Sequence, residues 1–278
     1  MEANIITSHQ NPKIKSLLSL QQKSSERRKS GLFIVEGRRE LLHCIEAGYQ
    51  IDTVFYCSDL TVQGGIHPEG YELVVDGEKH IIKGCKCFDV SKDIYNKVAY
   101  RGGTEGVIAE VKVRNTTLSD LQLPSNPLIV VLESVEKPGN LGAILRSADA
   151  SGVDAVIVCD PLTDLYNPNL IRSSIGGIFS VPCVACSSEE CIRFLKANNI
   201  QILTAQLQDS HLYYNIDMKK ATAIIMGTEA TGLTNQWREA ADAHIRIPML
   251  GKLDSLNVSI SSAILMYEAV RQRNTTKY

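Results

Sequence analysis

The second half of this chain alternates largely apolar segments with helical ones, and this pattern limits its possible folds more than any other feature. The apolar segments are LIVVLESV, VDAVIVCD, QILTAQL and ATAIIMG, and the patterns between them include 140–152 and 188–199. Strands that are apolar at every position are typical of parallel sheets covered by helices on both faces. We therefore predict an α/β domain built on a parallel sheet.

A smaller module precedes this domain. LFIVEG and IDTVFYC read as strands, and RRELLHCIEAG between them reads as a helix closed by Gly48. The stretch 113–127 is polar and contains two prolines, which is typical of a linker. The predicted organisation is an amino-terminal α/β domain over 1–112, a linker over 113–127 and the parallel-sheet domain over 128–278.

The last segment, 245–273, combines a short strand, a loop with Pro248 and Gly251, and a long helical pattern. Apolar residues recur at steps of three and four from position 256 to 270, which predicts the helix face that packs on the core. Ser255, Asn257 and Ser259 crowd the expected helix start, where their oxygens can accept from unpaired amides. Such a polar helix start after a glycine-bearing loop favours a ligand site.

Composition narrows the classes of function. The net charge of −2 and a pI of about 6.3 disfavour a protein that binds nucleic acid over its whole surface. The first 40 residues are nevertheless rich in Lys and Arg, which favours local contact with phosphates. The predicted phosphate contacts are Arg27, Arg28, Arg38 and Arg39.

Location and metal content are also predicted from composition. No apolar run reaches the roughly 18 residues that span a membrane, and the amino end lacks a signal-peptide core, so we expect a cytoplasmic protein. The eight cysteines lie mostly in apolar runs and lack zinc-finger spacing, so we expect free thiols and no metal.

Three loops follow predicted strands, at the sheet edge where α/β proteins bind ligands. They are 136–142, which leads to Arg146, then 227–233, and the loop of the last segment. The first lacks G-x-G-x-x-G and the second lacks the G-K-[ST] ending, which argues against a dehydrogenase and a P-loop nucleotidase. Glycines here let backbone approach a planar, largely uncharged ligand closely.

The three loops together resemble the motifs of the SpoU/TrmH family, RNA ribose 2′-O-methyltransferases of the SPOUT class. The matching residues are Asn140-x-Gly142-x-x-x-Arg146, Gly227-x-Glu229-x-x-Gly232-Leu233, and Ile247-Pro248-Met249 with Ser255-Leu256-Asn257-Val258-Ser259. The tail Tyr267-Glu268 with Arg271-Gln272 matches too, and the amino-terminal segment resembles the substrate-binding domain of many members. EKPGN departs from the usual Asp-Pro-x-Asn, which puts loop shape or substrate choice in doubt.

The resemblance implies a trefoil-knotted carboxyl-terminal domain that binds S-adenosylmethionine in a bent form, and a homodimer whose active site uses both subunits. The implied cofactor contacts are Gly227, Ile247, Met249, Leu250, Leu256 and Thr204. The implied reaction-site residues are Arg146, Asn140, Glu229, Ser255 and Asn257. Several roles stay open: Arg146 as base or as anchor for phosphate and oxyanion, Glu229 as direct or structural, and Asn257 as a helix cap.

The predicted function is transfer of a methyl group from S-adenosylmethionine to a ribose 2′-hydroxyl of structured RNA. Ribosomal RNA, 23S in particular, is preferred over transfer RNA because the two-domain resemblance favours it. The alternatives are a transfer-RNA methyltransferase and a non-catalytic RNA-binding assembly factor of the same fold. Binding of S-adenosylmethionine distinguishes the assembly factor from the enzyme.

Overall fold

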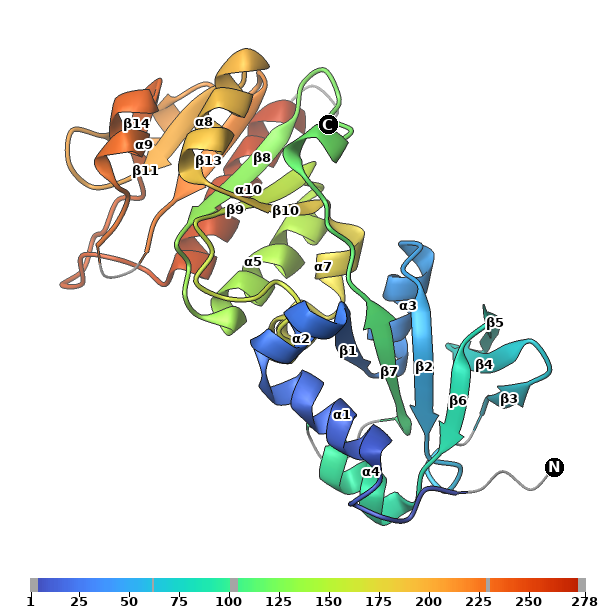
Figure 1. Ribbon diagram of the computed structural model, residues 1–278. Coiled ribbons are helices and arrows are strands. Elements are labelled where there is room, and N and C mark those ends of the chain that lie inside the picture. The colour runs from blue at the N-terminus through green and yellow to red at the C-terminus, as the bar shows by residue number, and fades with distance from the viewer. Residues whose placement is uncertain (1–4, 62, 101–104, 229–230, 275–278) are drawn as a thin grey trace. The chain divides into compact units, whose positions relative to one another are not determined.

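The computed structural model describes residues 5–61, 63–100, 105–228 and 231–274 (Figure 1). Contacts between Cα atoms divide the chain into two compact units. The first contains Met1–Arg114 and Tyr166–Ser180, and the second contains Asn115–Leu165 and Val181–Tyr278. The domain limits predicted from the sequence remain a prediction. They assign residues 166–180 to the second domain, whereas these residues belong to the first unit.

The first unit is built on a mixed sheet of four strands in the order β1-β7-β2-β6, with a separate antiparallel sheet β3-β4-β5. Its strands are β1 (Leu32–Glu36), β2 (Ile51–Tyr56), β3 (Gly65–His67), β4 (Gly70–Val75), β5 (Glu78–Lys83), β6 (Lys86–Asp89) and β7 (Val107–Lys112). Its helices are α1 (Pro12–Gln22), α2 (Ser24–Ser30), α3 (Arg38–Glu46), α4 (Lys92–Val98), α6 (Pro168–Ser173) and α7 (Gly177–Ser180).

Helices α6 and α7 join the first unit through apolar contacts. Leu170 and Phe179 are buried, α6 packs against β1, and α7 packs against α3. The ring of Tyr166 stacks on Phe33 with 4.3 Å between centroids. Deleting residues 1–112 would therefore expose an apolar surface on the remaining chain.

The second unit is a parallel sheet of seven strands in the order β10-β9-β8-β13-β11-β14-β12, which confirms the predicted fold class. Its strands are β8 (Leu128–Glu133), β9 (Ala155–Cys159), β10 (Cys183–Cys186), β11 (Gln201–Ala205), β12 (His211–Leu212), β13 (Thr222–Met226) and β14 (Ala243–Arg246). Its helices are α5 (Pro138–Ser151), α8 (Ser188–Ala197), α9 (Asn235–Ala240) and α10 (Val258–Asn274), with short 3-10 turns η1 (Leu118–Asp120) and η2 (Tyr213–Asn215).

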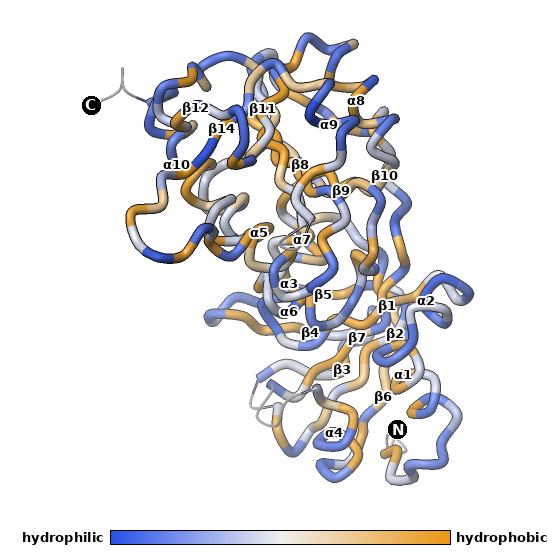
Figure 2. Tube along the Cα trace, turned by 90° about the vertical axis from the view of Figure 1, so that its left-hand side faces the viewer, coloured by the Kyte–Doolittle hydropathy of each residue, from blue (hydrophilic) through white to orange (hydrophobic). Residues whose placement is uncertain are grey.

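The apolar strands lie at the centre of this sheet because each is buried on both faces. Every residue of β8, β9 and β13 is buried, and β8 and β9 run as hydrophobic segments in Figure 2. Trp237 of α9, which is fully buried, completes the core on one side. Parallel pairing brings the carboxyl ends of these strands to one edge, where the site lies.

The last helix differs from its prediction. It begins at Val258, and its buried face carries Val258, Ser262, Leu265, Met266 and Ala269. The predicted face is exposed instead: Ile260 and Tyr267 each keep 51% of their surface. The period was right but the packed face was wrong, because a helix with apolar residues all round does not tell which side meets the core.

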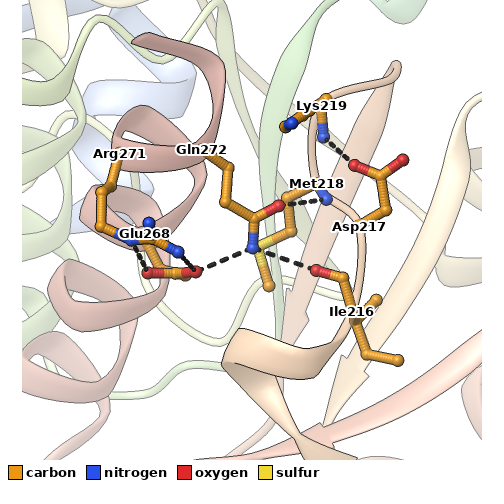
Figure 3. Close-up of polar contacts among 7 residues, drawn as sticks. All are labelled: Ile216, Asp217, Met218, Lys219, Glu268, Arg271 and Gln272. Atoms are coloured by element: carbon orange, nitrogen blue, oxygen red, sulfur yellow. Dashed lines mark hydrogen bonds and ion pairs between the residues drawn. The ribbon is translucent and has the colours of Figure 1, made fainter. Parts of the chain in front are cut away.

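The end of α10 is tied to the segment that leads into β13 (Figure 3). Gln272 donates to Ile216 O at 3.0 Å and accepts from Met218 N at 2.8 Å, and it also donates to Glu268. Arg271 donates twice to Glu268 at 2.8 Å, and these bonds hold the pKa of the Glu268 carboxyl below its usual range. Glu268, Arg271 and Gln272, which match the family's tail motif, thus hold the end of α10 in place.

Within the described residues, no helix combines the length and the hydropathy that crossing a membrane requires.

Candidate active site

A cavity of about 530 Å³ lies in the second unit at the carboxyl ends of β11, β13 and β14. Its walls come from three stretches: 205–208 after β11, the loop after β13, and 245–258 at the end of β14 and beyond. This volume falls within the roughly 300–1,000 Å³ usual for small-molecule sites. The two later loops singled out in the sequence therefore share one cavity.

The two ends of the loop after β13 lie close together. Thr228 and Gly232 form an isolated bridge, with Gly232 N donating to Thr228 O at 3.0 Å. A Cβ at Gly227 would lie 2.5 Å from Gly232 O and 2.6 Å from Leu233 N. Gly232 has a φ of 68°, in the left-handed region that favours glycine. Both glycines are therefore required by the shape of the loop itself.

The loop before α10 brings the first and third motifs together. Asn257 Nδ2 donates to Asn140 Oδ1 at 3.2 Å, and Asn257 Oδ1 accepts from Ser259 N at 2.9 Å, as a helix cap does. Asn257 and Ser255 both line the cavity. One asparagine thus caps α10 and fixes Asn140 at the margin of the cavity, so its capping and site roles coexist.

Asn140 and Arg146 lie on one helix, because α5 begins at Pro138 rather than after the predicted loop. Six residues correspond to about 600° around a helix axis, so the two side chains leave α5 in different directions. Arg146 is exposed and does not line the cavity. Within one chain, the described structure does not bring Arg146 to the other predicted site residues.

The predicted cofactor contacts fall into two groups. Gly227, Ile247, Met249 and Leu256 line the cavity. Thr204 does not: it is buried in β11 and shares a 2.6 Å hydrogen bond with His244 Nδ1. Leu250 is also outside the lining, with 96% of its surface exposed. Glu229 lies outside the described residues.

Two polar residues of the cavity were missed by the sequence reasoning. Gln206 Oε1 and Arg238 Nε are buried, and neither has a hydrogen-bond partner among the residues that the structure describes. Buried polar atoms are rarely left unpaired, so these two are suited to a ligand. The sequence held one signal for Gln206, which lies near the end of the predicted strand QILTAQL. Arg238 lies on a helix that was not predicted.

Glu133 was missed as well, although it lies in the predicted strand LIVVLESV and ends the observed strand β8. Its side chain is buried with 3% of the residue exposed, and it accepts from Thr234 N at 2.9 Å and from Thr234 Oγ1 at 2.6 Å. Thr234 follows the cavity residue Leu233 and precedes α9. Glu133 therefore fixes the far end of the loop after β13 from the neighbouring strand β8.

We expect Glu133→Gln to weaken binding of the cavity's ligand about tenfold or more, because a glutamine oxygen replaces a charged acceptor whose bonds are worth roughly 1.5–3 kcal/mol each. The measurement is ligand affinity by calorimetry beside the melting temperature. Asp160→Asn is the matched control, because Asp160 accepts from Ser188 Oγ at 2.6 Å in the same region without contacting the loop. Equal losses of affinity in both variants would contradict a positioning role for Glu133.

Only some of the arginines predicted to contact phosphate are exposed. The prediction for Arg27 is wrong, because the residue is buried with 3% of its surface exposed. It donates to Leu20 O at 2.5 Å and to Gln21 O, and so ties α2 to the end of α1. Arg38 is half-buried and donates to Glu105 O at 3.3 Å. Arg39 is exposed beside Asp76 at 3.7 Å, and Arg28 is exposed.

The lining of the cavity combines backbone and apolar side chains with a few polar groups. Its described residues include no histidine, cysteine or lysine, and Asp254 is the carboxylate among them that could act as a general base. The cavity also offers apolar side chains such as Met226, Met249 and Leu256, and the unpaired atoms Gln206 Oε1 and Arg238 Nε. A flat group with a charged tail, such as an adenosine joined to an amino acid, fits this donor set.

Two family models match the chain. The SpoU rRNA Methylase family matches residues 127–267, and the MRM3-like substrate binding domain matches residues 11–109. The first match covers the cavity, α5 and most of α10. The second covers most of the first unit.

Known relatives match along most of the chain. A 23S rRNA (guanosine(2553)-2′-O)-methyltransferase of Bacillus subtilis (strain 168) is 27% identical over 94% of this chain and 97% of its own length. A 23S rRNA (guanosine-2′-O-)-methyltransferase of Escherichia coli (strain K12) is 38% identical over 61% of this chain and 72% of its own. The AdoMet-bound rRNA methyltransferase from Sinorhizobium meliloti superposes with a TM-score of 0.83 and 28% identity, over 96% of this chain and 97% of its own.

Proposed function

This chain belongs to the SpoU rRNA methylase family, and on that basis we propose which residues hold its cofactor and which hold its RNA. It is an S-adenosylmethionine-dependent RNA ribose 2′-O-methyltransferase. The substrate is ribosomal RNA, as for the relatives that it matches over most of their length. The observation that carries the residue assignment is the cavity shared by the loops after β13 and β14, with Asn257 joining it to Asn140.

Two measurements test this function. Calorimetry with S-adenosylmethionine should show one site per chain. Mapping of 2′-O-methyl marks in total RNA, with and without the gene, should show one 23S position that loses its mark. Loss of marks from transfer RNA alone, with 23S unchanged, would contradict the ribosomal substrate.

The cofactor is held by the lining of the cavity. Gly227, Ile247, Met249 and Leu256 surround the adenosine, largely through backbone and apolar contacts. Arg238 and Gln206 supply the polar contacts for the amino-acid end, where a guanidinium suits a carboxylate. When bound, this cofactor supplies a methyl group already activated on a sulfonium, so the chain's task is alignment and preparation of the ribose hydroxyl.

Arg146 prepares the hydroxyl without removing its proton. Guanidinium stays protonated above about pH 12, so it serves poorly as a base. It can instead anchor a phosphate with two parallel bonds and stabilise negative charge that develops on the ribose oxygen. Asn140, Ser255 and Asn257 frame the same reaction site from the margin of the cavity. Glu229, in the second motif, is assigned to the same reaction site, either directly or by orienting the neighbouring residues.

The enzyme acts as a homodimer, and Arg146 serves the partner's cavity. Two observations support this: Arg146 does not line its own chain's cavity, and α10 carries an apolar stripe that is not covered. The stripe consists of the exposed Ile260 and Tyr267 with the half-buried Ile264 between them, spaced at i, i+4 and i+7 on one face, a pattern typical of helix–helix contact. An exposed apolar stripe of this kind marks an interaction surface.

We expect the double variant Ile260→Glu, Tyr267→Glu to be monomeric by light scattering and to lose methyl transfer, because two buried charges would face the partner. Ile66→Glu is the control, since Ile66 is an equally exposed apolar residue on β3 in the first unit. A variant that stays dimeric would exclude the α10 stripe as the interface.

The first unit grips RNA through exposed arginines. We expect Arg28→Ala, Arg39→Ala to weaken RNA binding and to lower the slope of log affinity against log salt by about 0.7–0.9 for each phosphate that the variant no longer neutralises. Cofactor affinity should not change. Arg193→Ala is the control, because Arg193 is an exposed arginine of α8 in the second unit. An unchanged salt slope would remove Arg28 and Arg39 from the RNA interface.

A further inference from the structure

Three thiols meet in the second unit, away from the cofactor cavity. Cys159 is the last residue of β9, Cys186 is the last residue of β10, and Cys191 lies on α8. Their Sγ atoms all lie within 4.8 Å of one another. None of the three lines the cavity.

Local structure fixes this convergence. The strands β9 and β10 pair in parallel with Cys186 directly opposite Cys159. Ser187 then caps α8 in a capping box with Glu190, with Ser187 N donating to Glu190 Oε2 at 2.9 Å and Glu190 N donating to Ser187 Oγ at 3.2 Å. This turn directs α8 back over the sheet and puts Cys191 beside the two strand ends.

The three cysteines differ in exposure. Cys159 and Cys191 are fully buried in the apolar core, whereas Cys186 is only partly buried. The cluster therefore has two inner sulfur atoms and one outer sulfur atom that solvent can reach. Cys183, on the same strand as Cys186, is not part of the cluster.

We propose that Cys159, Cys186 and Cys191 bind one divalent thiophilic cation of the zinc class. The thiol protons leave as the ion enters: three thiols and M²⁺ become three thiolates on M²⁺, and the three protons pass to solvent. The occupied cluster then carries a net charge of −1. A monovalent ion such as Cu(I) would leave −2 in the apolar core, which burial disfavours.

The geometry needs only a small contraction. Bonds of about 2.3 Å from zinc to sulfur place tetrahedral sulfur ligands about 3.8 Å apart, against the present limit of 4.8 Å. Side-chain rotation of three cysteines can supply this difference. The bound ion would tie β9, β10 and α8 together.

Cobalt(II) titration of the full-length, reduced protein without oxygen tests the site. We expect one ion per chain, with a thiolate-to-cobalt charge-transfer band in the near ultraviolet. Calorimetry in buffers of different ionisation enthalpy should show that protons are released as the ion binds at pH 7, as metal binding to thiols requires. Zinc should displace the cobalt and abolish the band.

Matched variants locate the site. Cys186→Ser and Cys191→Ser should each lose the band, whereas Cys183→Ser should keep it. Cys85→Ser, Cys87→Ser should keep it too, although these two sulfur atoms lie 3.8 Å apart in the first unit. Circular dichroism checks that the serine variants fold. Proton release by the wild type tests the site even if one of the variants does not fold.

Three results would overturn the proposal. One is a reduced wild type that develops no band. Another is a band that survives in Cys186→Ser or disappears in Cys85→Ser, Cys87→Ser. The third is a thiol count that falls by two in air together with no metal uptake after reduction, which would make the cluster a disulfide site instead.

Discussion

Replacing Arg146 with lysine is expected to lower kcat for methyl transfer about a hundredfold or more, as removal of one preorganised donor typically does. Lysine keeps the positive charge, but its ammonium is a compact point charge that cannot hold phosphate and ribose oxygens in one planar fork. Cofactor affinity should stay within a few-fold, because the residues assigned to the adenosine, Gly227, Ile247, Met249 and Leu256, belong to the other two motifs.

Single-turnover methyl transfer with the purified variant and its RNA measures this effect. Arg193→Lys is the matched control, since Arg193 is an exposed arginine of α8 that pairs with Glu189. An Arg146→Lys enzyme that turns over near the wild-type rate would leave Arg146 as a source of charge only.

Mixed dimers show which chain's cavity Arg146 serves. A dimer of one Arg146→Lys subunit and one Gly227→Ala subunit has one site with an intact cavity and an intact Arg146 if the arginine acts across the interface. We expect such mixtures to recover activity that neither variant has alone. No recovery in isolated mixed dimers would place Arg146 at the cavity of its own chain.

Gly227→Ala is expected to weaken S-adenosylmethionine binding by roughly five- to 150-fold, the range that 1–3 kcal/mol of overpacking corresponds to. The added Cβ meets backbone rather than a flexible side chain, at 2.5 Å from Gly232 O and 2.6 Å from Leu233 N, so the loop must move. The residues that move are those that line the cavity, and kcat/KM for the cofactor should fall with the affinity.

Calorimetry with the cofactor measures this loss, and Gly251→Ala is the control. Gly251 lies in the loop before α10, and nothing lies within 4 Å of a Cβ placed there. Wild-type affinity in Gly227→Ala would mean that the loop after β13 does not hold the cofactor. Equal losses in both variants would point to general damage to the loops.

The parts of the fold that the sequence predicts are those where one strong signal acts alone. The strands β8, β9 and β13 are apolar at nearly every position, so burial on both faces leaves only a parallel sheet. The predictions of the packed face of α10 and of an exposed Arg27 were wrong because both depend on tertiary packing. Arg27 donates to the carbonyl of Leu20 across the turn between α1 and α2, and the periodicity of the sequence does not predict this contact.

The site shows the same division. The resemblance pointed to Gly227, Asn257 and Asn140; Gly227 and Asn257 line the cavity, and Asn140 is bonded to Asn257. Glu133 and Arg238 were missed because their importance comes from tertiary partners: a carboxylate that accepts from Thr234 far along the chain, and a guanidinium nitrogen left unpaired in a cavity. A single sequence does not contain those pairings.

The anchor at the end of α10 has a consequence for the order in which the enzyme becomes active. Arg273 donates to the carbonyls of Asn126, Met218 and Lys220, so the last helix closes onto the entrances of β8 and β13. The residues just before α10 also form a wall of the cofactor cavity. During synthesis, a chain that does not yet include α10 therefore lacks both the helix that closes onto β8 and β13 and one wall of the cofactor cavity. Chains truncated before this segment are expected to bind no cofactor and to be inactive as methyltransferases.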